Sequence, residues 1–120
     1  MIYTTYFAKL NKLPINVVPI SICISVPGFY NGLQYKKIAP TYDLLARYKR
    51  DKDIRYYTEY FNQNILGPLD PHVIATELQN MGDGKDVALV CYEKSSDFCH
   101  RHLVAKWFRE NGIECEEYIC

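Results

Sequence analysis

One segment in the last third of the chain constrains the fold more than any other. An apolar run, Asp86–Tyr92, has the length and composition of a central buried strand. A short polar loop follows, and a helix then opens on Cys99, His100 and Arg101. Thiols, a carboxylate, an imidazole and a guanidinium are thereby placed within one strand–loop–helix turn. Open α/β sheets bind their ligands at such turns, so the sequence predicts a site there.

The remaining patterns predict a single small α/β domain over residues 1–120, with a mostly parallel central sheet of about four strands flanked by helices. Runs rich in apolar and β-branched residues predict the strands Ile2–Phe7, Val17–Ser25, Asp86–Tyr92 and Ile113–Cys120, the last as a charged edge strand. The segment Phe29–Pro40 has no period and is expected to be a long loop.

Apolar residues at spacings of three and four predict four helices. The first helix is expected to begin at Thr41, and the second to span Ile54–Ile65. The third is expected to follow the Asp70–Pro71 cap. The fourth is expected to run from a Ser96 or Asp97 cap to Glu110. Because strand and helix alternate in the C-terminal half, a right-handed crossover and a parallel strand pair are expected there.

Charge and composition exclude several classes of protein. Lysine plus arginine and aspartate plus glutamate both number 14, which argues against binding to a nucleic-acid polymer. Prolines and Gly28 interrupt the apolar region 13–30, so it is not expected to span a membrane. The odd number of cysteines, five, and an N-terminus without signal-peptide features predict a cytoplasmic protein with reduced thiols.

The predicted turn carries the residue types that nucleophilic chemistry requires. Either Cys91 or Cys99 is a candidate nucleophile, with Glu93 or His100 as its acid–base partner. The first turn of a helix favours anions, so the thiol pKa of Cys99 is expected to be lowered and Arg101 to bind a phosphate or carboxylate. The structural alternatives are that both cysteines are unreactive residues packed in the core, and that Glu93 and Arg101 form an ion pair that stabilises the loop.

Two more specific chemistries fit the spacing poorly. Cysteine phosphatases need an arginine six residues after the nucleophile, whereas Asp97 occupies that position relative to Cys91. Structural zinc needs about four ligands, of which Cys91, Cys99 and His100 would supply three, and the chain has no Cys-x-x-Cys pair. The sequence therefore predicts neither a metal nor another cofactor.

The combination of Cys91-Tyr-Glu-Lys94 with Cys99-His-Arg101 resembles the signature of the domain-of-unknown-function family numbered 488. The segments Ile22–Ser25, Gly32–Lys36 and Ile38–Pro40 resemble the second strand and following loop of that family. The resemblance implies a small α/β domain with a shared site, but no substrate. Ser25 stands near the position where many members carry a basic residue, and Lys36 or Lys37 is a substitute for that charge.

Two functions of different classes are compatible with these patterns. The leading hypothesis is a small anionic ligand, a nucleotide or phosphorylated metabolite, bound at the turn 91–101 with thiol chemistry. The expected ligand contacts are Arg101, Ser25, Tyr30, Tyr35, Lys36 and Tyr92. The alternative is a protein-interaction module whose surface includes Tyr56 and Tyr60. The sequence leaves open whether the chain forms a homo-oligomer.

Overall fold

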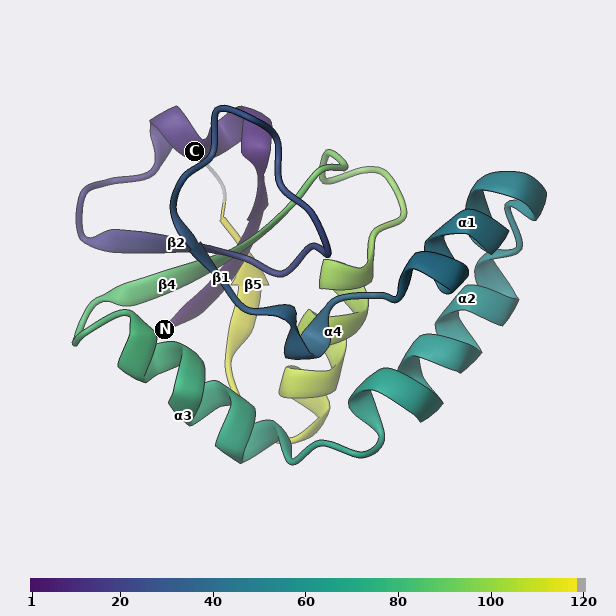
Figure 1. Ribbon diagram of the computed structural model, residues 1–120. Coiled ribbons are helices and arrows are strands. Elements are labelled where there is room, and N and C mark those ends of the chain that lie inside the picture. Colours follow the sequence, from purple (N-terminus) through teal and green to yellow (C-terminus); the bar gives the residue numbers. More distant parts are fainter. Residues whose placement is uncertain (119–120) are drawn as a thin grey trace.

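The computed structural model describes residues 1–118, within which five strands form one all-parallel sheet in the order β3-β2-β4-β1-β5 (Figure 1). The strands are β1 (Ile2–Tyr6), β2 (Val17–Ser21), β3 (Leu33–Gln34), β4 (Asp86–Cys91) and β5 (Cys115–Glu117). In the central strand β4 every residue from Val87 to Cys91 is buried, as its continuous apolar run predicts. The predicted fold class is confirmed, with one strand more than expected.

The helices are α1 (Tyr42–Asp51), α2 (Ile54–Tyr60), α3 (Pro71–Met81) and α4 (His100–Glu110), and α2 continues into a π-helical segment, Phe61–Leu66. Shorter 3-10 turns lie at Phe7–Lys12 and Lys36–Ile38. Both α3 and α4 pack on the sheet, whereas α1 and α2 lie side by side at one end of the molecule (Figure 1). Within the described residues, no helix is long and apolar enough to cross a membrane.

The predicted signal at the start of α3 is confirmed. The Asp70 carboxylate accepts a hydrogen bond from the His72 backbone N–H at 2.9 Å, and Pro71 occupies the first helical position. Buried side chains from the sheet and helices, including Ile2, Leu89, Val104 and Phe108, form the core.

Several predicted boundaries are wrong. Strand β2 ends at Ser21 rather than Ser25, because the chain then leaves the sheet and the Cys23 N–H bonds to the Ser21 hydroxyl. The expected loop 29–40 contains β3 and a 3-10 turn. Helix α4 begins only at His100, because residues 94–97 form a separate turn and Cys99 is the N-cap. The last strand stops at Glu117, and residues 119–120 of the predicted strand lie outside the described residues.

Candidate functional site

The pairing of β2 with β4 brings together two thiols that are far apart in the sequence. Ser21 is the register partner of Val90, so the residues that follow each strand leave the sheet next to each other. The Cys23 thiol lies 3.6 Å from the carbonyl oxygen of Val90, and Cys91 is the next residue in β4. Both thiols therefore lie at the carboxyl edge of the sheet, where open parallel sheets bind ligands.

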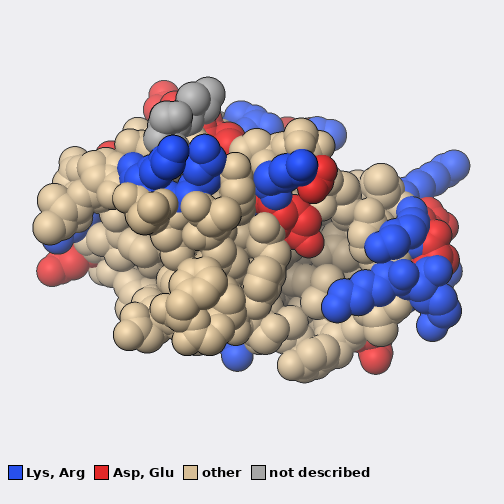
Figure 2. All heavy atoms as spheres, turned by 90° about the horizontal axis from the view of Figure 1, so that it is seen from above, with Lys and Arg blue, Asp and Glu red and all other residues tan. Residues whose placement is uncertain are grey.

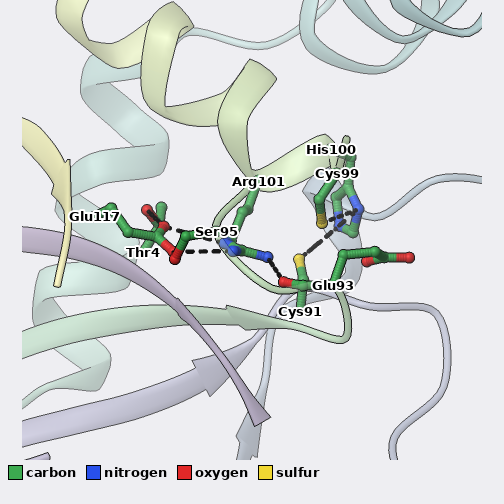
Figure 3. Close-up of polar contacts among 8 residues, drawn as sticks. All are labelled: Thr4, Cys91, Glu93, Ser95, Cys99, His100, Arg101 and Glu117. Carbon is green, nitrogen blue, oxygen red and sulfur yellow. Dashed lines mark hydrogen bonds and ion pairs between the residues drawn. The ribbon is translucent and has the colours of Figure 1, made fainter. Parts of the chain in front are cut away.

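His100, in the first turn of α4, places its imidazole against the sulfurs of both Cys91 and Cys99 (Figure 3). Its Nε2 lies 2.7 Å from the carbonyl oxygen of Ile22, and 3.5 Å from the Cys91 sulfur. Its Nδ1 lies 3.8 Å from the sulfurs of both Cys91 and Cys99. Because a carbonyl oxygen only accepts hydrogen bonds, Nε2 carries the proton that is donated to Ile22, which fixes the ring orientation.

The buried cluster shifts the pKa values of its members in opposite directions. Hydrogen bonding with Cys91 holds the pKa of both Cys23 and Cys99 below the usual thiol value, against the opposing effect of burial. His100 lowers the pKa of Cys99 further. Burial raises the pKa of Cys91 itself. The cluster therefore favours a neutral Cys91 thiol beside more acidic thiols on either side.

The acid–base candidates at this site are also shifted. Burial alone would lower the pKa of His100, but hydrogen bonding and charge interaction with Cys99 raise it overall. Desolvation raises the pKa of the Glu93 carboxyl, and the neighbouring Cys99 adds to that effect. Glu93 is consequently easier to keep protonated than an ordinary surface glutamate, which suits a general acid.

A pocket of about 340 Å³ opens beside the cluster. One wall carries the titratable side chains of Cys23, Glu93, Cys99 and His100. The rest of the lining comes from the loop after β2, from α1, α2 and the residue Pro40 before α1, and from the residues before α4. These residues are Ile24, Ser25, Pro40, Leu45, Tyr48, Lys49, Tyr57, Tyr92 and Phe98. Figure 2 shows lysine and arginine side chains gathered over the α1–α2 end, beside the hollow that separates this end from the sheet. The pocket thus combines aromatic walls, a thiol–imidazole–carboxyl side and one lining lysine.

Arg101 contacts other residues of the chain and does not line the pocket. Its side chain is fully buried, and it donates to both carboxylate oxygens of Glu117, at 3.1 and 2.9 Å. It also donates to the backbone carbonyl of Glu93 at 2.5 Å, while the Glu93 carboxylate points away from it (Figure 3). Thr4 and Ser95 donate to the same Glu117 carboxylate. The alternative of a Glu93–Arg101 ion pair is therefore wrong, and of these two residues only Glu93 lines the pocket.

The structure sorts the predicted ligand contacts into two groups. Ser25 and Tyr92 line the pocket, together with the predicted Glu93, Cys99 and His100. Cys91 lies directly behind His100 without lining the pocket. Arg101, Tyr30, Tyr35 and Lys36 lie outside the lining: the Tyr30 hydroxyl donates to the Leu33 carbonyl, the Tyr35 hydroxyl donates to Glu77, and Lys36 is exposed.

Sequence reasoning missed Cys23 and the contribution of α1 and α2. Cys23 belongs to an apolar segment that predicts a strand, and a buried cysteine is common there as a small apolar residue, so the local sequence gives no signal for a site. Tyr48, Lys49 and Tyr57 reach the pocket because α1 and α2 lie beside the turn before α4, where Tyr48 and Tyr57 each pack against Phe98. The spacing of apolar residues predicts a helix, but it does not predict which distant segment of the chain that helix will contact.

The fold and the site together define a parallel α/β domain with a thiol-lined pocket at the carboxyl edge of its sheet. A family model described as the active DUF488-N3 subclade matches residues 26–112, which is more than half of the chain. The chain therefore belongs to the DUF488 family, as the motif at residues 91–101 predicts. No curated protein and no solved structure matches the chain.

Proposed function

We propose that this protein binds a small ligand, with a planar ring and an anionic group, in the pocket beside Cys99 and acts on it through that thiol. The observation that carries the proposal is the shared lining: Cys99, His100 and Glu93 face one aromatic-walled pocket at the carboxyl edge of a parallel sheet. A volume of about 340 Å³ lies within the range of small-molecule sites.

The chemistry is covalent catalysis. The Cys99 sulfur forms a bond to an electrophilic carbon of the ligand, and the bond from that carbon to the leaving group breaks with its electron pair. The protonated Glu93 carboxyl donates its proton to the leaving group. A water molecule then attacks the same carbon, which releases the thiolate and returns a proton to Glu93.

The lining also favours a class of ligand. Tyr48, Tyr57 and Phe98 offer ring faces and edges against which a flat heterocycle packs. Lys49 supplies a positive charge at the same pocket, which suits a phosphate or carboxylate. A nucleotide or a phosphorylated metabolite has both features. Thiol chemistry needs reduced cysteines, so the proposed location is the cytoplasm.

The alternative of an interaction module receives less support from the tyrosines on which it depends. Tyr56 and Tyr60 are half-buried and stack on each other with ring centroids 6.0 Å apart. The guanidinium carbon of Arg47 lies 3.5 Å from the centroid of the Tyr56 ring, so this ring already has an intramolecular partner. The interaction role of these two residues stays a prediction.

The first test is selective alkylation. We expect brief treatment of the native protein with iodoacetamide to modify Cys99 before Cys115, because both thiols are buried but only Cys99 lines the pocket. Peptide mass spectrometry measures the modified fraction at each cysteine. Cys99→Ser should remove the fast modification, whereas Cys115→Ser should leave it unchanged. Equal rates at the two positions in the wild type would contradict the proposed nucleophile.

The second test addresses the ligand. We expect at least one member of a panel of nucleoside monophosphates and sugar phosphates to raise the melting temperature and to slow alkylation of Cys99. At a ligand concentration 100 times the dissociation constant the stabilisation is about 2.7 kcal/mol. Lys49→Ala should weaken this effect, whereas Lys36→Ala should not, because Lys36 is exposed outside the pocket. A shift lost equally in both variants, or absent with every compound, would count against this pocket.

A further inference from the structure

We propose that Cys23, Cys91 and His100 form a zinc site whose remaining coordination position opens to the pocket beside Cys99. The three side chains come from three separate parts of the fold, namely the loop after β2, the end of β4 and the first turn of α4. Their ligand atoms all lie within 4.8 Å of one another, and all three residues are buried. The inference does not depend on the reaction proposed for Cys99.

The donor set matches the chemistry of zinc. Zinc in proteins prefers thiolate sulfur and imidazole nitrogen, and two thiolates with one histidine is a known catalytic combination with an open fourth position. Two thiolates also balance the double positive charge of the ion. Hard cations such as magnesium and calcium prefer oxygen ligands, whereas these three residues offer two sulfur atoms and one nitrogen atom.

The imidazole is already oriented for coordination. Nε2 donates to the Ile22 carbonyl oxygen at 2.7 Å, which leaves the lone pair of Nδ1 in the neutral ring free for a metal. A hydrogen bond from the second ring nitrogen to a carbonyl is the usual support of a metal-bound histidine. The ring is further fixed by Phe61, whose centroid lies 5.7 Å from that of the imidazole.

The distance from Nδ1 to the Cys91 sulfur is close to that in a tetrahedral zinc site. Typical zinc–sulfur and zinc–nitrogen bonds place neighbouring sulfur and nitrogen ligands about 3.6 Å apart. Nδ1 lies 3.8 Å from the Cys91 sulfur. It lies equally far, 3.8 Å, from the Cys99 sulfur, which therefore borders the open position. The three ligand atoms lie within 4.8 Å of one another, so they need to move closer together when a metal binds.

A metal here gives the pocket a positive charge for an anionic ligand, which Arg101 does not supply because it lies outside the lining. Cys23 and His100 both line the pocket, so the open coordination position faces a bound ligand. A zinc ion at this position attracts an anionic oxygen, such as that of a phosphate or carboxylate, and polarises the group that carries it. Its charge also stabilises a thiolate at Cys99. The predicted exclusion of a metal rested on the missing Cys-x-x-Cys pair, and Cys23 supplies the thiol that a local motif would have supplied.

The test is metal binding by the whole chain under a non-thiol reductant. We expect about one zinc ion per chain by mass spectrometry of the protein reconstituted with zinc and passed through a desalting column. Cobalt should replace zinc and give the thiolate charge-transfer band and the intense visible bands of a tetrahedral site. Cys23→Ser and Cys91→Ser should each weaken cobalt binding at least about tenfold, since even outer-shell partners change affinity by that factor. The matched control Cys115→Ser, which removes a buried thiol outside the cluster, should bind as the wild type does.

Each outcome decides the proposal. It is wrong if the wild type shows no thiolate–cobalt band, if Cys23→Ser and Cys91→Ser bind as tightly as the wild type, or if Cys115→Ser loses as much affinity as they do. Circular dichroism shows whether the variants are folded, and should they not fold, the wild-type cobalt spectrum decides alone. Cys99→Ser should retain the metal but lose fast alkylation, so failure of the zinc site and failure of the proposed thiol reaction are distinguishable.

Discussion

Arg101→Ala should destabilise the protein by about 3–5 kcal/mol, because it leaves the Glu117 carboxylate without its buried partner. Arg101 is fully buried and makes a two-pronged contact with Glu117, and it also holds the Glu93 carbonyl. Urea denaturation followed by circular dichroism measures the change. The control Arg55→Ala removes a largely exposed ion pair with Glu59 and should cost about 0.5 kcal/mol or less.

Two further measurements test the cause of this loss. In a double-mutant cycle with Glu117→Gln, the combined variant should be less destabilised than the sum of the single variants. The pKa of Glu117 is lowered in the folded protein: burial opposes this, but the hydrogen bond from Arg101 prevails, with those from Ser95 and Thr4 adding to it. The stabilisation is therefore present above the unfolded pKa and is lost as the pH falls through the lower folded pKa. An Arg101→Ala effect that does not shrink in acid would contradict the ion pair as its cause.

Phe61→Ala should cost about 3–5 kcal/mol, because it removes a fully buried ring and leaves a cavity. Phe61 packs nearly parallel to Tyr57, at an interplanar angle of 9°, and against the His100 imidazole. The matched control is Phe29→Ala, which removes the same side chain where it is 71% exposed, and should change stability by about 0.5 kcal/mol or less. Similar losses in the two variants by thermal and urea unfolding would show that the Phe61 site is not a rigid part of the core.

The candidate site could be placed from local sequence, because the residue types that indicate it lie in one strand–loop–helix turn. The apolar run of β4 and the Asp70–Pro71 cap are short-range signals, and both are confirmed. The family resemblance, which rests on this turn and on segments between residues 22 and 40, is also confirmed. Cys99, His100 and Glu93 line one pocket because they flank this turn directly.

The partners of these residues could not be predicted, because the sheet topology decides them. Strand β2 lies beside β4, and this neighbour relation alone brings Cys23 to Cys91. Arg101 pairs with Glu117 because β5 joins the sheet beside β1, next to the start of α4. The sequence pattern marks Glu117 only as one of several acids on an edge strand. Glu93, the nearer carboxylate in the sequence, is the partner that the structural alternative assigns to Arg101, and the structure pairs Arg101 with Glu117 instead.

The strand order has a consequence for how the chain assembles during folding. Among residues 1–118, strand β1, the first in the chain, lies between β4 and β5, the last two strands. Contacts between such distant segments are entropically costly to form, so the sheet is expected to close late and slowly. Until β4 inserts between β1 and β2, Cys23 and Cys91 are unprotected thiols on a flexible chain. Insertion of this one strand therefore both completes the core and shields the thiols from oxidation and mispairing.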